Sequence, residues 1–276
     1  MQQETSLEVR VEPPYTQWIG IPASPQGELL GRSLSSWRKS AKQSLGLPVD
    51  MPIVIVGHQP TFFHPGILAK FIAGHHVAAQ IGGALTFLVV DHQMGITGNI
   101  DIPVQVDEDL TIREGRVGIL DAGIAIKDQD RVEVSEVLEP MSSALEHAHG
   151  ENAAMQYAHA IKTLMAPWAA VHHVVAGCDL LATELGKAIL QEMNRNPQHC
   201  INTYNEAVSH YPDCDIPKLH PKELPLWQGK YNQRVEITNG DLRPRALLLT
   251  LLARLSIGAL FIHGTGGEAY GNSMAL

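Results

Sequence analysis

The sequence predicts an α/β fold, with a Rossmann-like, three-layer core in which helices cover both faces of a parallel sheet. Short apolar runs rich in β-branched residues alternate with stretches of helical periodicity, most clearly between residues 53 and 90. Apolar residues make up 45% of the 276-residue chain, whereas aromatic residues make up only 5%. An aliphatic core of this kind is typical of helices packed on parallel strands, and the length suits one such domain with insertions.

One strand–helix–strand unit is the strongest support for this fold. Ile53–Val56 is a β-branched run that ends at Gly57, and Thr86–Val90 is a second run of the same kind. Between them, residues 65–80 have apolar side chains at helical spacing, and Pro65 suits the first helical turn. The unit predicts two parallel strands joined by a right-handed helical crossover.

The N-terminal part is expected to lie outside this core. Residues 1–50 are expected to form an N-terminal arm and helix. Alternating apolar residues at Leu7–Val11 indicate an edge strand, and residues 29–45 have the mixed polarity of a surface helix.

Residues 51–276 are expected to form the Rossmann-like core with two insertions. Short β-prone segments separated by Asp, Glu and Gly indicate a small β insertion at residues 100–137. Residues 140–240 are expected to be a helical and irregular insertion, because an Ala- and Leu-rich part is followed by a polar part with scattered prolines. The pair His172–His173 is placed in a helical stretch by this interpretation.

The last part of the core is expected to be a helix followed by an inner strand. Leucines at helical spacing predict a helix over Asp241–Leu255, with Asp241 near its cap and Pro244 in its first turn. Ala259–Ile262 is an apolar run typical of a buried strand, and a glycine-rich loop follows at residues 263–270.

Composition excludes several classes of function. The net charge is −9 and no cluster of Lys and Arg is present, so a nucleic-acid partner is not expected. The most apolar stretch, Ala246–Ile262, is too short for a membrane span and is interrupted by Arg254. Cys178, Cys200 and Cys214 match no zinc or redox spacing, and an odd count fits a reducing compartment. A cytoplasmic protein with a small-molecule substrate is therefore expected.

Three loops are candidate binding segments because each directly follows an apolar strand-like run. They are residues 57–66, 91–95 and 263–270. Ligands in parallel α/β folds bind beyond the carboxyl ends of the strands, so the three loops are expected to meet. The alternative for each loop is a tight turn that binds no ligand.

The first loop has features suited to a phosphate. Gly57 permits a sharp turn, and His58, Gln59 and His64 offer hydrogen-bond donors. Gly66 lies at the start of a predicted helix, where free N–H groups favour an anion. Neither the GxGxxG pattern nor a P-loop is present, so an ordinary dehydrogenase or P-loop enzyme is not expected.

The other two loops contribute polar and flexible positions. Asp91 and His92 form an acid/base pair after the second predicted strand, and they are suited to a ribose, an amine or a metal. The third loop allows close approach of its backbone to a ligand through residues His263, Gly264, Gly266 and Gly267.

Three blocks of the sequence carry a resemblance to a known family: GHQPTFFHPGILAKF, FLVVDHQ, and LRPRALLLTLLARL with HGTGGEAY. They resemble the BshC family, the bacillithiol-synthesis cysteine-adding enzymes. The chain departs from the family pattern at Val90, where the family has Glu, and family members continue into a helical, coiled-coil-forming region. Separately, HPGI resembles the HxGH signature of adenylate-transferring enzymes, with Ile67 in place of the second histidine, and HQP resembles one motif of the WbqC-like family.

The resemblance implies ATP or ADP as a cofactor and ligation of an amino acid or carboxylate to an amine. His58 and His64 would contact phosphates, Asp91 and His92 would orient the amine or ribose, and Arg243 would hold a carboxylate or phosphate. One alternative is a non-catalytic or truncated nucleotide-binding relative. A weaker alternative is a metal-dependent hydrolase using His58, His64, His92 and His263, whereas the leading hypothesis includes no metal.

Overall fold

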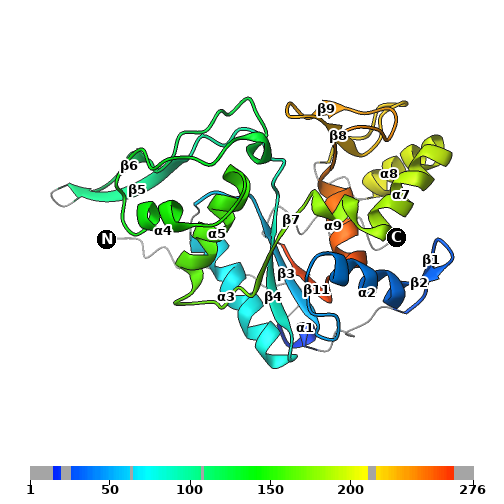
Figure 1. The fold of residues 1–276 in the computed structure, drawn as a ribbon, viewed down its shortest axis with the longest axis horizontal. Helices are drawn as coiled ribbons and strands as arrows, with labels where there is room; N and C mark the ends of the chain where they lie inside the picture. Colours follow the sequence, from blue (N-terminus) through cyan, green and yellow to red (C-terminus); the bar gives the residue numbers. More distant parts are fainter. Residues whose placement is uncertain (1–14, 20–25, 63–64, 107–108, 211–215, 264–276) are drawn as a thin grey trace, which may run out of the picture.

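The computed structural model describes residues 15–19, 26–62, 65–106, 109–210 and 216–263, and it has the predicted α/β fold (Figure 1). A four-stranded parallel sheet has the strand order β11–β3–β4–β7. The strands are β3 (Ile53–His58), β4 (Ala84–Val89), β7 (His173–Ala176) and β11 (Leu260–Ile262). All six residues of β4 and the first four of β3 are buried, as expected for strands covered on both faces.

Helices pack on both faces of this sheet. One face is covered by α3 (Pro65–Gln80) and α5 (Ala153–Met165), and the other by α2 (Leu34–Ser44), α6 (Asp179–Ala182) and α9 (Ala246–Ser256) (Figure 1). Successive strand residues alternate between the two cores, because side chains along a strand point to opposite faces. The face of α3 and α5 receives Val54, Val56, Leu85, Phe87 and Val89, and the opposite face receives Ile53, Ile55, Ala84 and Leu88.

The order in which the chain visits the strands reverses direction at β3. It runs from β3 to β4 and then to β7, and it finally returns to place β11 on the other side of β3. Helix α3 joins β3 to β4 across one face, whereas α9 precedes β11 on the opposite face. The topological switch point therefore lies at the carboxyl ends of the neighbouring strands β3 and β11. Ligands bind at this position in open α/β sheets.

Two smaller antiparallel parts lie beyond the same end of the main sheet, at the top of the view (Figure 1). One is the hairpin β5 (Asn99–Val106) and β6 (Asp109–Arg116), and the other is the sheet of β8 (Leu226–Gln228), β9 (Gln233–Arg234) and β10 (Leu242–Pro244). After the hairpin, the 3-10 helix η1 (Ile126–Asp128) returns to the carboxyl edge of the main sheet. There Ile126 N donates to Gln93 O at 3.0 Å and Lys127 N donates to Asp91 O at 2.9 Å.

The remaining elements are short or peripheral. Residues 15–18 form α1 (Tyr15–Trp18), and β1 (Glu28–Leu29) pairs with β2 (Arg32–Ser33). Helix α4 (Met141–His147) packs on α5 in a third apolar cluster, and α7 (Glu184–Arg195) and α8 (Pro197–His210) follow α6. Among the described residues, no helix is long and apolar enough to cross a bilayer.

Three sequence-based expectations about elements need correction, and the first concerns the N-terminal part. Helix α2 begins at Leu34, because Ser33 caps it by accepting a hydrogen bond from Ser36 N at 3.3 Å and β1 and β2 precede it. Trp37 and Ala41 are buried, and α2 packs on α9, so this helix covers the core instead of belonging to an arm. The strand expected at Leu7–Val11 lies outside the described residues.

The second correction concerns residues 140–240, expected to be an insertion with His172–His173 in a helical stretch. His173 is the first residue of β7, which pairs with β4 and forms one edge of the main sheet. A run of only four residues does not have enough periodicity to separate a strand from a helix. The insertion is therefore interrupted by a strand of the core.

The third correction concerns the helix expected over Asp241–Leu255. Leu242–Pro244 is strand β10, paired with β8, and α9 begins at Ala246. Pro244 therefore lies in an edge strand, the position in a sheet that tolerates proline, instead of the first turn of the helix.

Candidate functional site

The carboxyl ends of the parallel strands bring the first residues of the three predicted loops to one edge of the sheet. His58 is the last residue of β3, Asp91 lies two residues beyond β4, and His263 directly follows β11. Cys178 lies two residues beyond β7 at the same edge. Along this edge, the polar residues form two groups with different surroundings.

The first group, here called the β3–β11 group, consists of Gly57, His58, Lys70 and His263. Lys70 of α3 donates from Nζ to Gly57 O at 3.1 Å. The His263 ring stacks on Phe261, with centroids 4.2 Å apart and an interplanar angle of 21°. The Phe261 ring lies so close to Gly57 that a β-carbon there would be 2.7 Å from its Cζ, so a larger residue would require the ring to shift.

Burial lowers the pKa values of Lys70 and His263 in the β3–β11 group. It lowers the pKa of the Lys70 ammonium group to about 8. Burial, reinforced by the positive charges of Arg254 and Lys70, lowers the pKa of His263 to about 4. At pH 7, Lys70 is therefore still mainly charged, whereas His263 is neutral and has one ring N–H to donate. Both side chains suit an anionic ligand.

His58 has a fixed ring contact within the same group. Its Nδ1 lies 2.9 Å from the carbonyl oxygen of Gln59. Because a carbonyl oxygen only accepts hydrogen bonds, this contact requires the proton on Nδ1. In the neutral ring, Nε2 is then the basic nitrogen, which is the form a general base needs.

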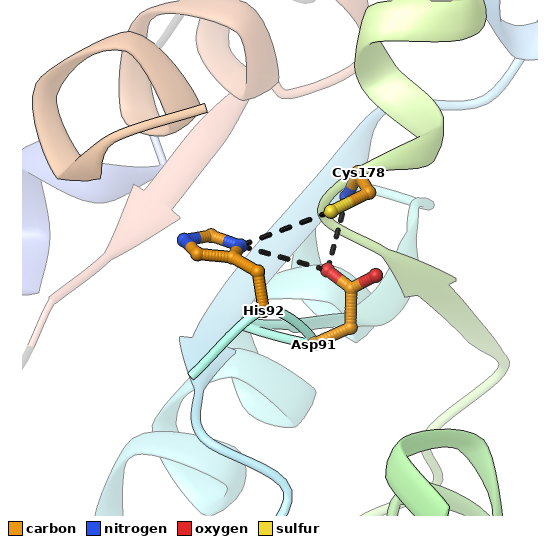
Figure 2. A group of neighbouring side chains, drawn as sticks. All are labelled: Asp91, His92 and Cys178. Carbon is orange, nitrogen blue, oxygen red and sulfur yellow. Dashed lines mark hydrogen bonds and ion pairs between the residues drawn. The ribbon is translucent and has the colours of Figure 1, made fainter. Parts of the chain in front are cut away.

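The second group, here called the β4–β7 cluster, consists of Asp91, His92 and Cys178. His92 Nδ1 lies 3.8 Å from Asp91 Oδ1 and 3.9 Å from Cys178 Sγ. The backbone N–H of Cys178 donates to Asp91 Oδ1 at 3.0 Å. Figure 2 shows that the carboxylate and the thiol approach the same nitrogen of the imidazole from two different loops. The exposed fractions of the three residues are only 2%, 6% and 8%, respectively.

This geometry does not suit a nucleophilic triad. In a triad, the nucleophile and the orienting carboxylate use different nitrogens of the histidine, whereas here both contact Nδ1. Burial and the negative charge of Asp91 raise the pKa of Cys178, so its thiol stays protonated at neutral pH. Burial also raises the pKa of Asp91, but contacts with His92, Lys127 and the Cys178 N–H outweigh burial and lower it.

Charged residues from later parts of the chain surround the β4–β7 cluster. Lys127 of η1 interacts electrostatically with Asp91, Cys178 and Asp241. Burial lowers the pKa of Lys127, but the Cys178 thiol once it is ionised at high pH, and the carboxylates of Asp91 and Asp241, outweigh burial and raise it. Asn232 donates from Nδ2 to His92 O at 2.8 Å.

Arg243 is the largest fully buried side chain near this cluster. Its Nη2 forms ion pairs with Asp128 Oδ2 at 2.6 Å and Asp241 Oδ2 at 2.7 Å. Nε and Nη1 are buried and have no hydrogen-bond partner among the described residues. One nitrogen is therefore held by the protein's own aspartates, and the expected role of Arg243 toward a ligand carboxylate or phosphate stays a prediction.

The remaining predicted residues have different surroundings. Gln59 directly follows β3, and Gly66 is the exposed second residue of α3. His64, Gly264, Gly266 and Gly267 lie outside the described residues, so their expected part in binding stays a prediction. The weaker hypothesis placed four histidines in one metal site. Among the described residues, His92 belongs to the β4–β7 cluster, whereas His58 and His263 lie at the ends of β3 and β11.

Two residues of the two groups, and the neighbouring Lys127, were not predicted from the sequence. Lys70 could have been found as the first lysine of the helix that follows the first loop. Cys178 could have been found only with β7 assigned, because it follows Gly177 at that strand end. Lys127 comes from a segment with no sequence signal that links it to the sheet. No protein-family model and no curated protein matches this chain.

Proposed function

We propose that this protein binds an adenine nucleotide, ATP or ADP, at the carboxyl edge between β3 and β11. We further propose that it uses ATP to join an amino acid or another carboxylate to an amine, as a BshC-like ligase. The observation that carries the proposal is the position of the β3–β11 group at the switch point of a parallel sheet. Lys70 and His263 there offer hydrogen-bond donors to an anion.

The residues of this group suit the chemistry of carboxylate activation. A carboxylate oxygen attacks a phosphoryl group of ATP and displaces ADP or pyrophosphate. The amine nitrogen then attacks the activated carbonyl carbon, the phosphate-bearing group leaves, and the nitrogen gives up one proton. Lys70 and His263 would stabilise charge on the phosphate oxygens, and His58 Nε2 would accept the proton.

Calorimetric titration of the full chain with ATP and with ADP tests the binding step. Lys70→Met is expected to weaken binding about 10-fold or more, because a charge-assisted hydrogen bond contributes about 1.5–3 kcal/mol. Lys187→Met is the matched control, since Lys187 is an exposed lysine on α7, far along the chain from the group. Absence of binding by both nucleotides, or equal affinity of the Lys70→Met variant, would contradict the proposal.

A nucleotide-binding protein without turnover is the second candidate. It is favoured by the burial of Asp91 and His92, which the sequence assigns to catalysis but which contact Cys178 in the protein interior. Formation of ADP or AMP from ATP, in the presence of mixed amino acids and amines, separates the two candidates. The ligase predicts product that is lost in His58→Gln while nucleotide affinity is kept. Binding with no product favours the second candidate.

A further inference from the structure

The β4–β7 cluster has the ligand types of a zinc site. Zinc in proteins is bound by thiolate sulfur, imidazole nitrogen and carboxylate oxygen, and the cluster supplies one of each. The three atoms come from two loops that only the sheet brings together, and all three residues are buried. This arrangement differs from an acidic surface patch, because each ligand is of a different chemical type and none faces open solvent.

The distances within the cluster fit a shared metal ion. The atoms Asp91 Oδ1, His92 Nδ1 and Cys178 Sγ all lie within 4.8 Å of one another, and Nδ1 lies 3.8 Å from Oδ1 and 3.9 Å from Sγ. Tetrahedral zinc with bonds of about 2.0–2.3 Å holds its ligand atoms about 3.3–3.8 Å apart. A small contraction of the cluster would therefore suffice.

The charges around the cluster leave room for a divalent cation. Four carboxylates, those of Asp91, Asp128, Asp179 and Asp241, interact with the two cations Lys127 and Arg243. When all four are ionised, this leaves two negative charges in excess, and ionisation of Cys178 would add a third. One zinc ion would neutralise two of these charges, and it would stabilise the thiolate that burial alone disfavours.

The first coordination sphere is also held in place by hydrogen bonds. Cys178 N donates to Asp91 Oδ1, and Asn232 Nδ2 donates to the main-chain oxygen of His92. The backbone of η1 bonds to the segment that carries Asp91 through Lys127 N. Outer contacts of this kind orient metal ligands and raise metal affinity.

We propose that Asp91, His92 and Cys178 bind one zinc ion. Three protein ligands is the number found in zinc sites that keep a fourth position for water or a substrate atom. The ion would tie the loop after β4 to the loop after β7. The proposal uses none of the residues that carry the nucleotide proposal, so either can fail without the other.

Metal analysis of the full chain, purified from zinc-supplemented medium and desalted, gives the first test. The wild-type protein is expected to carry about one zinc ion per chain, and Cys178→Ser is expected to lose it. Cys200→Ser is the matched control, because Cys200 is a half-buried cysteine on α8 that belongs to no such ligand group in the described part of the chain. Zinc-free wild-type protein that also fails to take up added zinc would overturn the proposal.

Cobalt substitution tests the thiolate ligand without relying on a variant of the cluster itself. The double variant Cys200→Ser, Cys214→Ser keeps Cys178 as its only cysteine. With Co²⁺ it is expected to show the thiolate-to-cobalt charge-transfer band and the visible bands of a tetrahedral site. If the wild-type protein shows the band and the folded double variant does not, another cysteine is the ligand and the proposal is wrong. Circular dichroism verifies that each variant is folded.

Discussion

The β3–β11 group and the β4–β7 cluster occupy two parts of one sheet edge, yet their surroundings differ. Lys70 and His263 are half-buried, and they lie where the strand order reverses. Asp91, His92 and Cys178 are almost fully buried, and a mixed set of charges surrounds them. The same topology thus supplies a partly open group of donors at the switch point and a closed group of metal-ligand types beside it.

The difference shows that position at a carboxyl edge does not by itself define a ligand site. The loop after β4 is covered by η1 and by Asn232, whereas the switch point leaves its polar side chains partly accessible. Access to solvent therefore separates residues suited to a diffusing substrate from residues suited to a buried ion. Four predictions test this comparison, from the largest expected effect to the smallest.

Weakening the packing of α9 on the sheet should destabilise the whole protein, and it should therefore affect both groups alike. Leu252 of α9 is fully buried, and its truncation in Leu252→Ala should lower the free energy of unfolding by about 2–5 kcal/mol. Leu251, the next residue, is 37% exposed, so Leu251→Ala should cost less than about 1 kcal/mol. Urea denaturation measures both values. A similar loss for the two variants would mean that α9 is not packed on the sheet as described.

Two glycines near the carboxyl ends of their strands, Gly57 in β3 and Gly177 directly after β7, should separate the groups. A β-carbon at Gly177 would lie 2.9 Å from the backbone oxygen of Val89, whereas the nearest atoms to one at Gly57 all belong to the ring of Phe261. Because a side chain moves more easily than a strand, Gly177→Ala should cost about 1–3 kcal/mol and Gly57→Ala less.

The two glycine variants should also differ in ligand binding. Gly177→Ala is expected to impair zinc uptake, because Cys178 is its neighbour, while Gly57→Ala is expected to impair nucleotide binding. Calorimetry with ATP and metal analysis of both variants provide the measurement. Equal effects of each variant on both ligands would show that the two groups act as a single site.

The pH dependence of nucleotide binding should report Lys70. Its pKa in the free protein is about 8, so affinity should fall as pH rises through 8, by up to about 10-fold for each further pH unit. Lys70→Met should remove this slope, whereas Lys187→Met should keep it. Calorimetry between pH 7 and 9.5 gives the result, and an unchanged slope in Lys70→Met would assign the pH dependence to another group.

The smallest expected effect is acid destabilisation through His263. Its pKa lies at about 4 in the folded protein, below the ordinary value of 6.5, so the unfolded chain binds more protons between these values. The contribution of His263 to stability is therefore complete above pH 6.5 and is lost as pH falls toward 4. His263→Asn should flatten the stability curve in that window. A parallel curve for the variant would show that His263 is not shielded from solvent.

Sequence patterns predicted the parts of this fold in which neighbouring elements are also close in the sequence. The unit β3–α3–β4 follows from apolar runs and helical spacing, and the sequence placed α3 at the observed residues 65–80. Strand β7 was not predicted because its four residues contain a histidine and follow a long Ala-rich stretch of the sequence. The expected helix start at Asp241 was wrong because Pro244 fits both a first helical turn and an edge strand.

The candidate site was predictable to the same extent. His58, Asp91 and His263 could be placed at one edge, because each follows an apolar run. The partners Lys70, Lys127 and Cys178 required tertiary contacts, since their spacing along the chain carries no shared pattern. Burial of Asp91 and His92 also depends on η1, which packs against their loop from a distant part of the sequence.

The strand order has a consequence for the sequence of events during synthesis. Asp91, His92 and Cys178 are all present once residue 178 has left the ribosome, and the parallel strands β3, β4 and β7 that carry them can already pair. The switch point must wait, because Val54 pairs with Leu260 and His263 is among the last of the described residues to be made. Long-range pairing of this kind is slow, so the two groups should mature at different times on a chain that folds as it emerges.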